Sequence, residues 1–137
     1  MNGGMKQMPH EERPHRLLVV EDEATVQAAL KKYFTAAGFE VRCACELEEA
    51  EALLVTNSYD VVIADLRLSW SYAAEGLEIL RFVRRHARRT HVVILSAYAS
   101  ADLQHSARAL GAGAFFQKPA ALPEIAAMVT RLLEAQP

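Results

Sequence analysis

The sequence of 137 residues lacks any long hydrophobic run, and no stretch approaches the ~20 consecutive apolar residues that a membrane-spanning helix needs. Its first sixteen residues are polar, with Pro9 and Pro14 where a secretory signal peptide would carry its apolar segment. We therefore expect a cytoplasmic protein that makes no membrane contact. The length leaves room for one domain of common size, with no second folded module beside it.

The sequence also has few cysteines and a small net charge. The two cysteines, Cys43 and Cys45, sit two residues apart in a predicted strand, a spacing that disfavours a disulfide, so we predict two free, buried thiols. A formal charge of -2 creates no overall field toward nucleic acid or anionic lipid. The basic cluster in residues 81–89 is interpreted as a solvated helix face, since no aromatic residues are interleaved with its arginines, and binding of nucleic acid or an acidic partner is the less favoured interpretation. No direct DNA binding is expected.

What the sequence does contain is a repeated pattern of short apolar runs. They lie at residues 17–20, 61–64, 92–95 and, more weakly, 114–116. Runs this short, apolar without alternation, are typical of parallel strands covered on both faces. A fifth candidate strand, residues 39–45, alternates apolar and polar side chains as a strand nearer an edge does.

Helical spacing separates these runs. Apolar residues three and four positions apart predict helices in residues 26–37, 50–54, 76–87, 103–110 and 122–133. Ser100 is a plausible N-cap for the fourth helix, and Gly38 and Gly111 follow the first and fourth helices. Strict alternation of five strands and five helices predicts an α/β fold, a doubly wound parallel sheet with helices on both faces. We place this domain at residues 17–135, after a polar, flexible lead at residues 1–16.

Polar side chains follow the predicted strands at their carboxyl ends, where sheets of this kind bind ligands. The acidic triplet 21–23 follows the first strand, Asp65 ends the third, Ser96 ends the fourth, and Lys118 follows the fifth. Carboxylates brought together repel one another and require a cation, and an all-oxygen set suits Mg²⁺. A carboxylate beside Mg²⁺ is a competent nucleophile for phosphorus, while Lys118 and Ser96 suit the phosphoryl oxygens.

These residues carry a family resemblance. Glu21-Asp22, Asp65, Ser96-Ala97 and Lys118-Pro119 resemble the signatures of response-regulator receiver domains of two-component signalling, and the match runs from Leu17 to about Leu133. The resemblance implies a (βα)5 flavodoxin-like fold with five strands in the order 2-1-3-4-5. A stand-alone, chemotaxis-regulator-like domain is our expectation, although a piece of a longer regulator stays open.

The resemblance also implies roles for individual residues. Asp65 would be the phosphoacceptor, with Lys118 and Ser96 on the phosphoryl oxygens. Mg²⁺ would be held by Asp22 and Asp65, by Glu21 directly or through water, and by the backbone carbonyl of Arg67. Ser96 and Phe115 would move on phosphorylation.

Partners follow from the same resemblance. A histidine kinase or histidine phosphotransfer protein would supply the phosphoryl group. The face formed by the fourth helix, fifth strand and fifth helix would signal to a downstream protein target, and a homodimer stays open. The protein would not be an enzyme beyond self-catalysed phosphoryl transfer and slow autodephosphorylation.

The chain departs from the family pattern in several places. Glu21 replaces a common aspartate, and the loop at residues 69–75, with Trp70 and Tyr72, looks longer than usual by an insertion of about three residues. Arg67 and Tyr98 flank the expected path of the hydrolytic water, so we hypothesise that they lengthen the life of the acyl phosphate.

Two other functions compete with the phosphoacceptor switch. One is a phosphohydrolase with an aspartyl-phosphate intermediate, which is disfavoured because Arg67 stands where many such enzymes have a general acid. The other is a phosphorylation-independent interaction module, which is disfavoured because an idle site has no need for mutually repelling carboxylates.

Overall fold

The computed structural model describes residues 13–66, 73–98 and 100–135, and for residues 73–76 the backbone alone. Arg67 and the loop with Trp70 and Tyr72 lie outside the described residues, as do residues 1–12 of the predicted lead. Within the described ranges, strands alternate with helices: β1 (Arg16–Val20), α1 (Ala24–Ala36), β2 (Glu40–Ala44), α2 (Leu47–Thr56), β3 (Val61–Leu66), α3 (Ala73–His86), β4 (His91–Ser96), α4 (Ala101–Ala109), β5 (Ala114–Gln117) and α5 (Leu122–Glu134).

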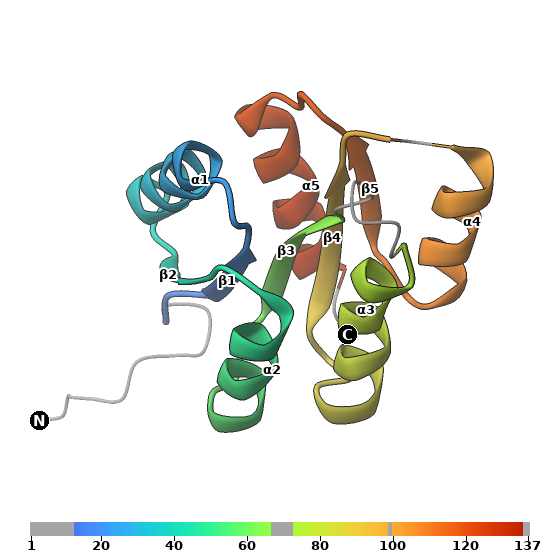
Figure 1. Cartoon of the computed structure of the whole chain (residues 1–137). Helices are drawn as coiled ribbons and strands as arrows, with labels where there is room; N and C mark the ends of the chain where they lie inside the picture. Colours follow the sequence, from blue (N-terminus) through green and yellow to red (C-terminus); the bar gives the residue numbers. More distant parts are fainter. Residues whose placement is uncertain (1–12, 67–72, 99, 136–137) are drawn as a thin grey trace, which may run out of the picture.

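The strands form one parallel sheet in the order β2-β1-β3-β4-β5 (Figure 1). This confirms the predicted doubly wound fold. The chain leaves β1 for one neighbour, β2, and then returns to the other side of β1 to form β3. Crevices beyond the carboxyl ends of strands open at such a change of direction, so the fold directs attention to the residues after β1 and β3.

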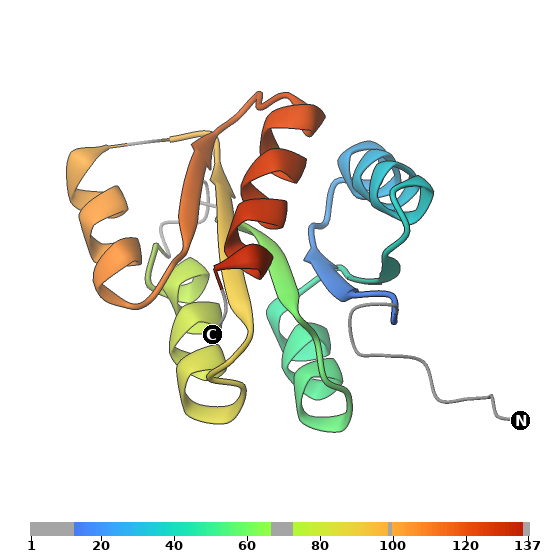
Figure 2. The same cartoon turned by 180° about the vertical axis from the view of Figure 1, so that it is seen from behind.

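Two layers of side chains cover the sheet. Because successive strand residues point to opposite faces, Leu17 and Val19 pack with α1 and α5, whereas Leu18 packs with α2 and α3. Figures 1 and 2 show these two helical layers from opposite sides. Burying one large apolar side chain contributes roughly 1.5–3 kcal/mol, so the central strands, buried on both faces, are the rigid base of the site.

The predicted helix ends are confirmed at three positions. Ser100 is the N-cap residue of α4 and has an extended backbone. Its side-chain hydroxyl oxygen accepts a hydrogen bond from the Leu103 N–H at 3.1 Å. Gly38 and Gly111 have φ values of +100° and +105°, a left-handed conformation that disfavours other residues. At the N-terminal end of the domain, β1 begins at Arg16, the last residue of the predicted lead.

The cysteine prediction holds in one respect only. Both thiols are free, as predicted. However, β2 ends at Ala44, so Cys45 lies in the following turn and is exposed, while Cys43 is half-buried. The expectation of two buried thiols was therefore wrong for Cys45. Among the described residues, no helix is both long enough and apolar enough to cross a membrane.

Candidate functional site

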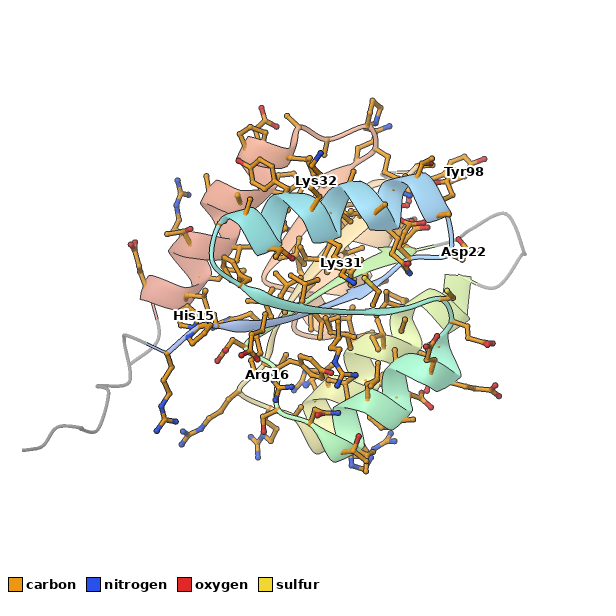
Figure 3. All side chains as sticks on the ribbon, turned by 90° about the vertical axis from the view of Figure 1, so that its left-hand side faces the viewer. His15, Arg16, Asp22, Lys31, Lys32 and Tyr98 are labelled. Carbon is orange, nitrogen blue, oxygen red and sulfur yellow. The ribbon has the colours of Figure 1, made fainter. Side chains whose placement is uncertain are left out.

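The carboxyl ends of four strands bring the predicted site residues to one edge of the sheet. Glu21 and Asp22 follow β1, Asp65 is the penultimate residue of β3, Ser96 ends β4, and Lys118 follows β5. The register agrees with this grouping, because the residue after Asp65 pairs with Ser96, and Ser96 pairs with Gln117. Figure 3 shows Asp22 and Tyr98 at one end of the molecule and His15 at the opposite end.

The Lys118 amine is held among three carboxylates. Its Nζ lies 3.2 Å from Asp65 Oδ1, 3.2 Å from Glu21 Oε1 and 3.6 Å from Glu23 Oε1. Burial alone would lower the pKa of Lys118, but the charges of Asp65 and Glu21 outweigh it and raise the pKa above its usual range. Lys118 is therefore a fixed positive charge. No separate role is predicted for Glu23 from the sequence, where its place in the acidic triplet is the one signal for it.

Glu21 is the most deeply buried charged group of the site, with a side chain 1% exposed. Its Oε2 accepts a hydrogen bond from the Glu23 backbone N–H at 3.0 Å, and its Oε1 accepts one from Lys118 Nζ at 3.2 Å. Burial raises the pKa of Glu21, and repulsion from Asp65 adds to the rise, while the Glu23 N–H and Lys118 oppose it. Lys118 and the N–H thus compensate a charge that would be costly without them.

Three carboxylates form a cluster suited to a divalent cation. Glu21, Asp22 and Asp65 each offer an oxygen, and these oxygens lie within 4.8 Å of one another. Asp22 is exposed, whereas the side chain of Asp65 is 6% exposed, so the cluster opens to solvent on one side. Hard oxygen ligands combined with access for water fit Mg²⁺ or Ca²⁺ better than a soft metal.

Ser96 and its neighbours complete the edge. Ser96 is fully buried, and its Oγ accepts a hydrogen bond from the Tyr98 N–H at 3.1 Å, while its carbonyl accepts one from the Lys118 N–H at 2.7 Å. The Tyr98 side chain is exposed. Phe115 is half-buried against the core on the side of α2, α3 and α4. The structure thus describes every predicted site residue except Arg67, and among them Phe115 is set back in the core.

Comparison with known proteins agrees with this arrangement. The model of the family described as "Response regulator receiver domain" matches residues 17–130. The chain belongs to this family. It is thus a receiver domain of two-component response regulators, a family of phosphoacceptor signalling domains.

Relatives of this receiver domain are regulators of greater length. It is 34% identical over 122 residues to the regulatory protein AtoC of Escherichia coli, covering 89% of this chain and 26% of that protein. It is 34% identical over 118 residues to the transcriptional regulatory protein PmrA of Pectobacterium parmentieri, covering 86% of this chain and 52% of that protein. The receiver domain therefore spans about a quarter to a half of these relatives.

A solved structure with the same fold contains a phosphorylated aspartic acid. It is a response regulator of Burkholderia pseudomallei with a phosphorylated aspartic acid, a calcium ion and citrate. The receiver domain matches it with a TM-score of 0.77 and 25% sequence identity, over 89% of this chain and 71% of that one. A divalent ion and an aspartyl phosphate thus coexist in a relative of this receiver domain.

Proposed function

We propose that this receiver domain is a phosphorylation switch that carries its phosphoryl group on Asp65. One observation carries the proposal: the Asp65 carboxylate, 6% exposed, is held 3.2 Å from Lys118 and within 4.8 Å of the oxygens of Glu21 and Asp22. This combination of nucleophile, fixed cation and metal-binding carboxylates is what phosphoryl transfer to an aspartate needs.

The side chains divide the transfer among them. A carboxylate oxygen of Asp65 forms a bond to phosphorus, and the bond between phosphorus and the donor's leaving group breaks. Lys118 neutralises a phosphoryl oxygen. The Ser96 hydroxyl accepts from the Tyr98 N–H, so its own proton is available for a phosphoryl oxygen.

Mg²⁺ is the proposed cofactor. Asp22 and Asp65 would hold it through carboxylates, Glu21 directly or through water, and the Arg67 carbonyl would be a further ligand. When bound, the ion neutralises negative charge that the transferring group and the carboxylates share.

The proposed phosphodonor is a histidine kinase or a histidine phosphotransfer protein. The proposed location of the domain is the cytoplasm. The proposed output surface is the face of α4, β5 and α5. Phe115 of β5 packs against the core cluster that includes residues of α4, and Ser96 pairs with Gln117 of β5, so both predicted switch residues adjoin this face. A downstream protein would read this surface. We expect no direct DNA binding by this domain, and a homodimer is an outcome that sedimentation would reveal.

The test is incubation with acetyl phosphate and Mg²⁺, followed by intact mass spectrometry. We expect a mass gain of one phosphoryl group that is stable in acid and lost in base, and that is absent in Asp65→Ala. Asp102→Ala, at an exposed aspartate in the first turn of α4, is the matched control and should retain the gain. Continuous release of inorganic phosphate from small phosphoesters would instead support a phosphohydrolase.

A further inference from the structure

Glu21 is the most deeply buried of the three carboxylates of the cluster. Its Oε2 accepts the Glu23 backbone N–H at 3.0 Å, and its Oε1 accepts the Lys118 amine at 3.2 Å. Both oxygens therefore have partners within the protein, and the side chain is 1% exposed. Asp22 is exposed, and one edge of the cluster is open there. A ligand that must exchange with water has better access at Asp22 than at Glu21.

The length of the Glu21 side chain is central to this arrangement. Its carboxylate reaches both a backbone N–H two residues ahead and an amine 97 residues away in the sequence. The Glu23 N–H belongs to the start of α1, where Glu23 is the N-cap residue. Glu21 thus ties Lys118, which stands on the loop after β5, to a fixed point at the start of α1. An aspartate at this position would carry its carboxylate one methylene closer to the backbone.

We propose that Glu21 is a positioning residue for Lys118, and that direct binding of the divalent ion is carried by Asp22 and Asp65. The inference rests on the proposed phosphorylation of Asp65. Glu21 holds the lysine amine 3.2 Å from Asp65 Oδ1, where the amine can meet an oxygen of the incoming phosphoryl group. Its carboxylate holds Lys118 in place, and direct coordination of the ion is left to Asp22 and Asp65.

Glu23 supplies a control that matches Glu21 in charge. Its carboxylate also lies near Lys118, at 3.6 Å, but its side chain is 59% exposed, and it is not part of the three-carboxylate cluster. Neutralising Glu23 removes one negative charge from the same edge without removing the buried link. A difference between Glu21→Gln and Glu23→Gln therefore reports the positioning contact and not the net charge of the site.

The first measurement is the affinity for Mg²⁺. It is obtained from an NMR titration of the backbone amides in the absence of any phosphodonor. We expect Asp22→Asn to weaken binding by about tenfold or more, and Glu21→Gln to weaken it by clearly less than Asp22→Asn does. If Glu21→Gln weakened binding as much as Asp22→Asn, Glu21 would be an ion ligand and the proposal would be wrong.

The second measurement is the rate of phosphorylation by acetyl phosphate at saturating Mg²⁺. We expect a fall of about 10- to 100-fold in Glu21→Gln, because a misplaced Lys118 no longer meets the phosphoryl oxygen, and a change of less than about fivefold in Glu23→Gln. In a Lys118→Met background, Glu21→Gln should cause no further loss. Additive losses, or equal rates in both glutamine variants, would overturn the proposal.

The two proposals fail in different ways. If the unmodified protein gained no phosphoryl group, the proposed function would fail, while the Mg²⁺ titrations would still decide which carboxylates bind the ion. If phosphorylation occurred on Asp65 but Glu21→Gln phosphorylated at the full rate, the role of Glu21 alone would be refuted. Far-ultraviolet circular dichroism of each variant checks that the fold is intact.

Discussion

Replacing Asp65 with asparagine should stabilise the metal-free domain, although it removes an ion pair. The Lys118–Asp65 pair at 3.2 Å contributes about 5 kcal/mol of attraction at an effective dielectric constant of ~20. Repulsion from Glu21 at up to 4.8 Å opposes it with about 3.5 kcal/mol, and repulsion from Asp22, halved for its exposure, with about 2 kcal/mol. These terms nearly cancel.

Desolvation then decides the sign. The Asp65 side chain is 6% exposed, and burying an ionised carboxylate carries a penalty of several kcal/mol, part of which its hydrogen bonds repay. A neutral amide of the same shape avoids the penalty, and Glu21 still pairs with Lys118 at 3.2 Å. We therefore expect Asp65→Asn to raise the free energy of unfolding by about 1–3 kcal/mol.

Urea denaturation in the presence of EDTA measures this effect. With a slope of about 1–3 kcal/mol per molar urea, the midpoint should rise by about 1 M. Asp102→Asn, at an exposed position, should change the free energy of unfolding by no more than about 0.5–1 kcal/mol. Mg²⁺ should reduce the difference in free energy of unfolding between the unmodified domain and Asp65→Asn. The bound ion relieves the repulsion of Asp65 by Glu21 and Asp22, which is already absent in the variant. A midpoint that falls in Asp65→Asn would show that attraction to Lys118 prevails, and the electrostatic account would be wrong.

Three further predictions concern single side chains. Ser100→Ala should lower the free energy of unfolding by about 1 kcal/mol in urea, because the Leu103 N–H loses its acceptor, and Ser106→Ala, within α4, is the control. Burial lowers the pKa of His91 below 6.5, against an opposing effect of Asp60, and its buried Nε2 has no partner among the described residues. Stability should therefore be full above pH 6.5 and decline on acidification below it, by at most about 1.4 kcal/mol per pH unit, and His91→Gln should lack this component. Tyr98→Ala should speed dephosphorylation, followed as loss of the phosphoprotein mass over time, and an unchanged rate would refute the shielding hypothesis.

The sequence predicted the elements that position the site because local signals agreed with one another. Four short buried runs marked the central strands and β5, and their ends located Asp65, Ser96 and Lys118 at one edge of a parallel sheet. Gly38 and Ser100 marked helix ends through conformational preferences that depend on a few neighbouring residues. The strand order came from the family resemblance and not from periodicity.

Other features depend on distances that sequence spacing does not contain. The contact of Glu23 with Lys118, and the use of both Glu21 oxygens, arise only when α1 and the loop after β5 are brought together. The exposure of Cys45 depends on β2 ending one residue earlier than its alternating pattern indicated. A single residue at a strand end was enough to move that thiol from the sheet to the turn.

The most direct test of the central claim is to locate the phosphoryl group. The domain is phosphorylated with acetyl phosphate and Mg²⁺, reduced with borohydride, which converts an aspartyl phosphate to homoserine, and sequenced by mass spectrometry. We predict homoserine at the position of Asp65, and none at Asp22. Homoserine at another aspartate, or a phosphoprotein that yields none at residue 65, would contradict the assignment of Asp65 as the phosphoacceptor.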